Sequence, residues 1–258
     1  MRIFAVPAAM MLACCLYMPL PKARSVLDHL LTRAYDCALR LFTRRSGQTD
    51  DMPALFTYLL LLGGALALLC ALHPLVSMVF MAPLFTGLAV LPGCAKVKDE
   101  LDSGKYARDI PTYERIVRYT CVSLSPAFVQ GVVTPMIVCA LGMPLHMGAS
   151  LGYVYAALCA LGDRLPAAAR AASFLQRIGG RVFVAFMVLC AGVVGRNPLR
   201  TRGALADERL MNILGIAGDG TDTHAPMAGD IPQGIFLCGF SSFMLCITLC
   251  IVGFVLCR

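Results

Sequence analysis

The sequence MPALFTYLLLLGGALALLCALHPLVSMVFMAPLFTGLAVLPGCA occupies residues 52–95, and His73 is its only acidic, basic or imidazole-bearing residue. A transmembrane helix needs about 20 apolar residues to cross the hydrocarbon of a bilayer, so these 44 residues are too many for one span. His73 and Pro74 stand near the middle, and proline interrupts helices. We therefore expect a helical hairpin over 54–94, with arms at 54–72 and 75–94 and with His73 in the turn.

The composition of the whole chain is that of a membrane protein. Of its 258 residues, 59% are hydrophobic and 14% are charged, whereas soluble domains carry about 25% charged residues. Most of the 13 cysteines lie in apolar runs, which is typical of small buried side chains. The sequence contains no Cys-x-x-Cys pair, so the cysteines do not predict a zinc site. The net charge of +7 comes from the links between apolar segments, and no basic face with interleaved aromatic residues predicts nucleic-acid binding.

Apolar and polar segments alternate outside this hairpin. The first apolar segment, 1–20, reads as a retained span or re-entrant segment, or alternatively as a cleaved signal peptide. The remaining expected segments are an amphipathic helix over 22–45, a charged linker over 96–119, a second hairpin over 120–161, a basic linker over 162–181, a short apolar segment over 182–195, a polar loop over 196–230 and a last span over 234–257. The predicted fold class is all-α, a polytopic integral membrane helical bundle of five to seven apolar segments in one domain, 1–258.

The basic residues predict how the chain is oriented. Sixteen of the 22 Lys and Arg residues lie in the three links 22–51, 96–119 and 162–181, and none lies in the two hairpin turns. By the positive-inside rule these links face the cytoplasm, so we expect a multi-pass protein of the cytoplasmic (inner) membrane. The segment 22–45 has a helical period, with apolar residues on one side and arginines on the other. It either lies against anionic lipid headgroups or forms an ordinary cytoplasmic helix.

A second stretch, SPAFVQGVVTPMIVCALGMP at 125–144, carries Gly and Pro in an apolar setting. With the amphipathic helix, the hairpin and the charged DELDSGKYARDI segment before it, this stretch resembles the CobD/CbiB family of cobalamin-pathway membrane proteins. That family's signature has the form E-S-x-x-E-N-x-x-D-G-V-V-x-P-L. The matching positions are Gly131, Val132, Val133 and Pro135, and Gln130 precedes them in the motif remnant; Arg181 in RIGGRV matches a later arginine of the family. The resemblance implies an adenosylcobinamide-phosphate synthase, which forms an amide bond on a corrinoid ligand and uses Mg²⁺.

The departures from this signature concern its acidic and amide residues. Where the family has Glu, Glu, Asn and Asp, this chain has Val122, Pro126, Ala127 and Gln130. Amide formation needs groups that handle protons and phosphate, which alanine, valine and proline cannot supply. A diverged synthase and a noncatalytic sensory or accessory protein, similar to AmpE-type membrane proteins, therefore both remain open. A transporter is a third hypothesis, weakened because no acidic residue falls within a predicted span.

One polar loop is a candidate metal site. AGDGTDTHAPMAGD, residues 217–230, brings Asp219, Asp222 and His224 together among glycines, with Asp230 at its end. Carboxylate and imidazole groups of this kind could hold Mg²⁺ for a phosphate-bearing substrate, although their spacing matches no familiar metal loop. The alternative is a polar loop without a ligand.

Overall fold

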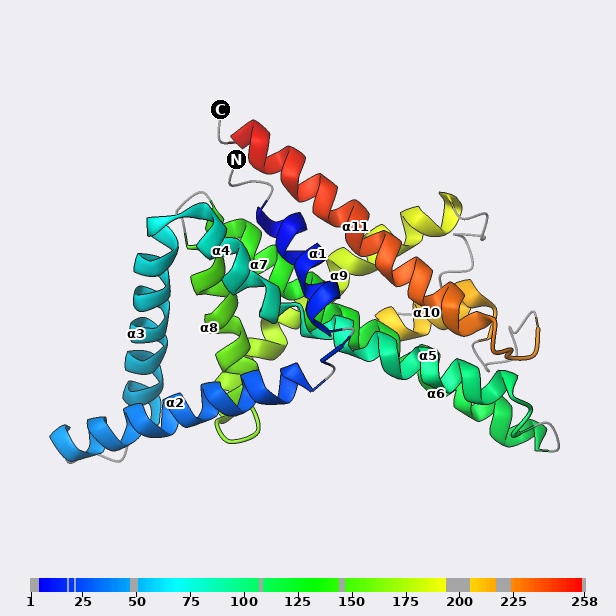
Figure 1. Ribbon diagram of the computed structural model, residues 1–258, viewed down its shortest axis with the longest axis horizontal. Helices are drawn as coiled ribbons and strands as arrows, with labels where there is room; N and C mark the ends of the chain where they lie inside the picture. Colours follow the sequence, from blue (N-terminus) through cyan, green and yellow to red (C-terminus); the bar gives the residue numbers. More distant parts are fainter. Residues whose placement is uncertain are drawn as a thin grey trace.

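The computed structural model describes residues 5–17, 19–20, 22–46, 51–106, 109–143, 147–193, 205–216 and 224–256, and within these ranges the elements are helical. Figure 1 shows their arrangement. The α-helices are α1 (Ala5–Tyr17), α2 (Ala23–Ser46), α3 (Asp51–Leu72), α4 (Pro74–Met81), α5 (Leu91–Asp102), α6 (Ile110–Phe128), α7 (Thr134–Gly142), α8 (Gly148–Leu161), α9 (Pro166–Val193), α10 (Ala206–Leu214) and α11 (Asp230–Leu256).

The predicted all-helical membrane fold is confirmed. Four stretches are helical, long and apolar enough to cross a membrane: Met52–Leu72, Ile110–Gly142, Pro166–Val193 and Asp230–Val255. A fifth candidate, Leu75–Leu84 with Thr86–Asp102, is bent by 46°, and α1 and α8 are shorter apolar helices. The chain is thus a multi-pass helical membrane protein. Large apolar side chains on α3 remain exposed, among them Leu68 and Leu72, as expected for a surface that contacts lipid.

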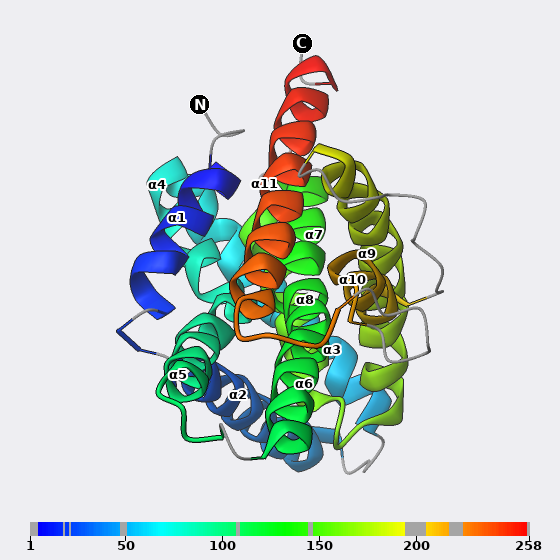
Figure 2. The same cartoon turned by 90° about the vertical axis from the view of Figure 1, so that its right-hand side faces the viewer.

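The stretch Ile110–Gly142 forms the centre of the bundle. Its most apolar part is 67% buried inside the protein, whereas the corresponding parts of α3, α9 and α11 are 28%, 28% and 33% buried. In Figure 2, α6 and α7 run through the middle, with α9 and α10 on one side and α1, α4 and α5 on the other. Phe128, Val132, Val133 and Met136 of this stretch belong to the main hydrophobic core.

The first hairpin forms as predicted at its turn, but its second arm is broken. His73 caps α4, because its Nδ1 accepts a hydrogen bond from the Leu75 amide at 3.2 Å. After α4 the chain passes through two short 3-10 segments, Ala82–Leu84 and Thr86–Val90, before α5. Pro83 cannot donate a main-chain hydrogen bond, which accounts for a break at this place. The expected charged linker 96–119 is mostly helical, formed by the end of α5 and the start of α6.

The later segments also differ from expectation. The basic linker expected over 162–181 and the short apolar segment over 182–195 are largely parts of one helix, α9. Its buried residues Ala168, Ala172, Gly179 and Phe183 follow a helical spacing, which leaves the arginines on other faces. The polar loop expected over 196–230 contains α10, whose buried residues pack against α6. Ala228, shortly before α11, is also bound to α6, since its amide donates to the Tyr113 hydroxyl at 2.8 Å.

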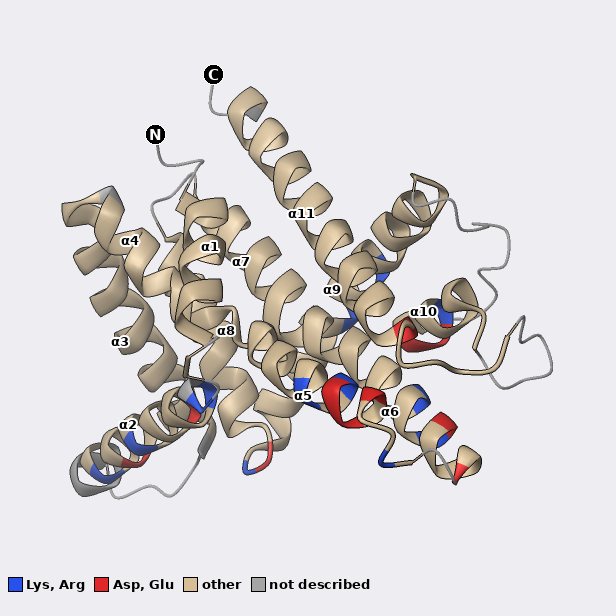
Figure 3. Cartoon of the chain, turned by 45° about the vertical axis from the view of Figure 1, so that its right-hand side comes forward, with Lys and Arg blue, Asp and Glu red and all other residues tan. Residues whose placement is uncertain are grey.

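Charged residues gather at one end of the molecule. Figure 3 shows acidic and basic positions on α2, on the turn after α8, and on α5, α6 and α10, with further basic positions on α9, whereas the described helices carry no charge at the opposite end. Arg164 in the turn after α8 pairs with Asp36 of α2 at 3.1 Å. The helix α2 also packs on α3, and the Tyr58 hydroxyl donates to the Leu31 carbonyl at 3.0 Å. This separation of charge agrees with three basic links on one side of a membrane.

Candidate functional site

The Gly-Val-Val-Thr-Pro stretch forms a π turn at the centre of the bundle. Residues Val129–Val133 widen the helix between α6 and α7, and the Thr134 amide donates to the Val129 carbonyl five residues earlier. The Thr134 hydroxyl donates to the same carbonyl at 2.7 Å. Pro135 has no amide hydrogen, so the carbonyls one turn before it lose a regular partner. Single π turns inside α-helices are frequent at functional sites.

The Gln130 carbonyl receives its hydrogen bond from another helix. The Thr134 amide, its regular partner in an α-helix, is used by Val129, and five residues on stands Pro135. The Tyr155 hydroxyl of α8 donates to the Gln130 carbonyl at 2.9 Å instead. Tyr155 is 3% exposed and the bond is partly buried, so it satisfies a main-chain group that the helix itself leaves without a partner. The π turn is therefore built jointly by the Thr-Pro sequence and by α8.

Gly131 allows the broken arm of the first hairpin to touch the π turn. A Cβ added at Gly131 would lie 2.5 Å from the Cα of Gly87 and closer still to its amide nitrogen. Both glycines are buried, and Gly87 lies in the 3-10 segment Thr86–Val90. The two irregular segments of the chain are thus in direct main-chain contact, which only glycine permits.

Two grooves open on either side of the π turn and share the polar residues Gln130, Ser173 and Gln176. The first, the α9 groove, has a volume of about 650 Å³ and is lined by Ser125, Pro126, Val129, Gln130, Ser173, Gln176, Arg177, Gly180, Arg181, Val184, Leu205, Ala206 and Asp207. The second, the α8 groove, has a volume of about 460 Å³ and is lined by Arg24, Leu27, Asp28, Leu84, Thr86, Gln130, Gly152, Tyr155, Ala156, Cys159, Ala160, Gly162, Asp163, Ala169, Ala172, Ser173 and Gln176.

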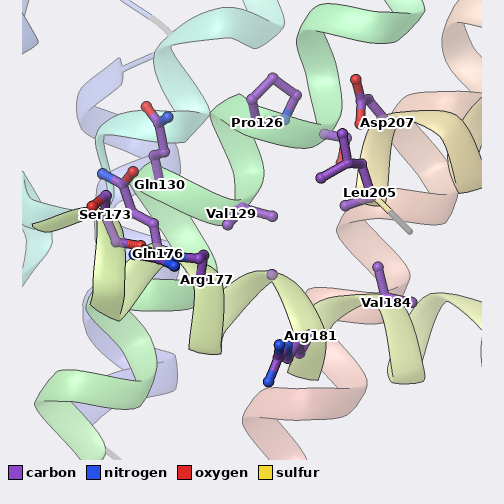
Figure 4. Close-up of a pocket in the computed structure, with 13 residues that line it drawn as sticks. Pro126, Val129, Gln130, Ser173, Gln176, Arg177, Arg181, Val184, Leu205 and Asp207 are labelled. Carbon is purple, nitrogen blue, oxygen red and sulfur yellow. Dashed lines mark hydrogen bonds between the residues drawn. The ribbon is translucent and has the colours of Figure 1, made fainter. Parts of the chain in front are cut away.

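The α9 groove combines apolar walls with two cations. Figure 4 shows Gln130, Ser173 and Gln176 grouped on one side and Leu205 and Asp207 on the other. Arg177 and Arg181 lie one turn apart on α9, and the Arg177 Nε donates to the Ser173 carbonyl at 3.4 Å. Ser125 is fully buried, and its Oγ has no hydrogen-bond partner among the described residues. The groove therefore offers donors to an anionic or polar group.

The α8 groove is more polar and lies toward the charged end. Arg24 Nε stands 3.9 Å from the Asp28 carboxylate, and Asp163 lies on the turn after α8. Burial raises the pKa of the Asp28 carboxyl above its ordinary value, while Arg24 acts in the opposite direction. The Gln176 amide nitrogen contacts the Cys159 sulfur at 3.6 Å. A carboxylate with a raised pKa, a guanidinium and amide groups can together bind a polar ligand and accept a proton.

The structure brings together some of the residues singled out by the motif. Gln130 and Arg181 line the α9 groove, although they lie on different helices. Gly131, Val132, Val133 and Pro135 are buried, and they shape the main chain of the π turn and α7 rather than face a groove.

The candidate metal loop is described only at its end. Asp219 and Asp222 lie outside the described residues. His224 Nε2 stands 3.0 Å from Asp230, which is 3% exposed and also accepts a hydrogen bond from the Met227 amide at 2.8 Å. These contacts hold residues 224–227 against Asp230, the first residue of α11. Within the described part of the chain, no three His, Cys, Asp or Glu residues form a group that could hold a metal ion.

Several groove residues carry no signal in the sequence. Tyr155 and Gln176 stand in apolar or basic helices without any motif, Ser125 lies in the motif stretch at a position that the signature leaves open, and Asp28 is one of several charged residues on an amphipathic helix. Tyr155, Gln176 and Asp28 reach the site only through packing between distant helices. The Thr134-Pro135 pair, however, does indicate that a carbonyl near Gln130 needs an external donor.

We compared the chain with models of protein families, with curated proteins and with solved structures, and found no match in any of the three comparisons.

Proposed function

We propose that this multi-pass membrane protein is a diverged relative of the CobD/CbiB family that binds a corrinoid precursor at the α8 groove. The observation that carries the proposal is the position of Gln130. It stands at the position where the family's signature has Asp, directly before the matching Gly-Val-Val, and it lies where both grooves meet. Cavities of about 300–1,000 Å³ hold drug-sized ligands, so a corrinoid, which is larger, would place only its carboxyl-bearing edge in the groove.

The α8 groove supplies acidic groups that the signature region lacks. Asp28 and Asp163 come from α2 and from the turn after α8, whereas Val122, Pro126 and Ala127 replace the acids of the signature itself. When an amine attacks an activated carboxyl, the C–N bond forms, the phosphate leaves and the amine loses a proton. Asp28 is suited to accept that proton because burial raises its pKa, and Arg24 is suited to bind the carboxyl or phosphate. The described residues do not provide a Mg²⁺ site, so no step is assigned to a metal.

Binding and catalysis can be tested separately on the purified protein in detergent. Cobyric acid or cobinamide is titrated and followed by its visible absorbance, and product formation with ATP and an aminopropanol-type amine is followed by mass spectrometry. We expect micromolar binding and ATP-dependent amide formation. Asp28→Asn should abolish the product while binding persists, whereas Asp102→Asn, an exposed carboxylate on α5, should change neither. Absence of corrinoid binding would refute the proposal.

A second candidate is a noncatalytic accessory protein similar to AmpE-type membrane proteins. It is favoured by Pro126, a groove-lining residue at a position where the family has an acid, and by Arg181, since the RIGGRV segment resembles these proteins as well. The same experiment distinguishes the two. Corrinoid binding without an amide product, unchanged in Asp28→Asn, would support an accessory role in the corrinoid pathway, and no corrinoid binding at all would leave a sensory role outside it.

A further inference from the structure

The α9 groove contains two cations without an acidic partner. Arg177 and Arg181 are four residues apart on α9, a spacing at which like charges repel each other. Among the described residues, neither guanidinium lies within 4.0 Å of a carboxylate. Both side chains are exposed and line the same groove, where they extend in different directions (Figure 4). An anion placed between them would remove the repulsion and accept several hydrogen bonds.

The depth of these arginines in a membrane also favours a bound anion, because an unpaired charge is costly in hydrocarbon. After Arg181, α9 continues for 12 residues, 182–193, which extend about 18 Å. The hydrocarbon of a bilayer is about 30 Å thick. A span that contains this segment therefore draws Arg181 to the edge of the hydrocarbon or into it. Arginines at such depths recruit water or lipid headgroups.

Ser125 points independently to a polar ligand in the same groove. Its side chain is fully buried, its Oγ has no partner among the described residues, and it lines the groove opposite α9. A buried hydroxyl without a hydrogen bond costs about 1–3 kcal/mol. Its Oγ is closed off from the groove in this conformation, so a ligand oxygen would accept its hydrogen bond after rotation about χ1.

The apolar surface beyond Arg181 suits the tail of an amphiphile. At 100° per residue, Ala185, Val188 and Gly192 follow Arg181 on one face of α9, and all three are exposed or half-buried. Val129 and Val184 give the groove itself apolar walls. A ligand seated here can thus hold a charged head at the arginines and extend an acyl chain along α9.

We propose that the α9 groove binds a membrane phospholipid, with its phosphate held by Arg177 and Arg181 and hydrogen-bonded by Ser125. The carboxylate of Asp207 across the groove repels a second negative charge, so the site favours the single charge of a phosphodiester over a free phosphate dianion. This inference does not depend on corrinoid binding, because the charged residues proposed for the corrinoid line the other groove.

The proposal is tested by measuring lipid retention and rebinding. The protein is delipidated in detergent, and binding of phosphatidylglycerol, phosphatidylethanolamine and inorganic phosphate is measured by native mass spectrometry. We expect the phospholipids to bind and inorganic phosphate neither to bind nor to compete. The Arg177→Gln/Arg181→Gln variant should bind phospholipid roughly tenfold more weakly or worse, as expected for losing charged hydrogen bonds.

Arg170→Gln is the matched control, because Arg170 is an exposed arginine of α9 that does not line the groove and, among the described residues, donates only to the Pro166 carbonyl, at 3.3 Å. It should bind phospholipid as the unaltered protein does. Elution as a single species in size-exclusion chromatography establishes that the double variant is folded. Equal lipid binding by the double variant and the control overturns the proposal, and so does binding of inorganic phosphate in preference to phospholipid.

Discussion

The main chains of Gly87 and Gly131 touch, so that a Cβ at Gly131 would lie 2.5 Å from the Gly87 Cα. This contact joins the break in the first hairpin to the π turn, and no side chain can move aside to relieve it. Gly131→Ala should therefore destabilise the protein by about 3 kcal/mol or more, the upper range for inserting a methyl group into a packed core. Thermal unfolding in detergent, followed by intrinsic fluorescence or by aggregation, measures the loss.

Gly93→Ala is the control for this prediction, since nothing lies within 4 Å of a Cβ built at Gly93 on α5. Alanine is favoured over glycine in a helix by up to about 1 kcal/mol, so this variant should be as stable as the original protein or more stable. Equal stability of the two variants would contradict the close contact.

Tyr155→Phe should leave the Gln130 carbonyl without this donor. The expected cost is about 1 kcal/mol, the usual net contribution of a hydrogen bond, with little change in shape because only one oxygen is removed. Tyr119→Phe, at a tyrosine that is 77% exposed on α6, should be neutral. In a Pro135→Ala background the restored amide can bond to one of the nearby carbonyls, so Tyr155→Phe should cost less there. An equal cost in both backgrounds would show that Pro135 does not create the need for Tyr155.

The gathering of charge at one end predicts which side of the membrane each end faces. Cys37 on α2 is exposed at the charged end, and His73 lies in a turn at the uncharged end. In variants that keep a single cysteine, a membrane-impermeant maleimide should label His73→Cys from outside the cell. It should label Cys37 only after the membrane is opened. The reverse labelling pattern would invert the topology.

The pH dependence of stability should report the burial of Asp28. Burial raises the pKa of its carboxyl above the ordinary value of 3.8, so the folded state binds this proton more readily than the unfolded state does. The ionised carboxylate therefore lowers stability at neutral pH, and this cost disappears as the pH falls below the raised pKa toward 3.8. Asp28→Asn should raise the melting temperature at pH 7 and have little effect near pH 4.

Arg24→Gln should act in the opposite direction at neutral pH, because Arg24 favours the charged form of Asp28. Melting curves of both variants between pH 4 and 8 test the pair. If the melting temperatures of Asp28→Asn and the original protein differ by the same amount at every pH, the charge of Asp28 is not the cause of the change in stability.

The long apolar runs were sufficient to predict the membrane fold, whereas α9 was not predicted. The run that surrounds His73 predicts a hairpin because only its turn interrupts the hydropathy. In α9 the arginines Arg170, Arg177 and Arg181 break up the hydropathy although the helix continues, because they lie on faces that are not packed. Averaged hydropathy does not separate the faces of a helix, so the basic half of α9 resembled a linker.

The candidate site was predictable only in part. The motif singled out Gln130 and Arg181, which the structure places in one groove. Tyr155 and Asp28 owe their positions to contacts between helices far apart in the sequence, and local spacing contains no information about such contacts. The π turn depends on the same contacts, since Gly87 and Tyr155 both meet it from other segments.

The π turn also fixes the angular phase between α6 and α7. An additional residue in one turn rotates every following side chain by about 100° relative to an unbroken α-helix. Met136 and Cys139 reach the interior, each fully buried, only with that rotation. Deleting a single residue between Val129 and Val133 would rotate Met136 and Cys139 out of the interior while leaving both helices intact. The length of this turn therefore sets which face of α7 follows the buried face of α6.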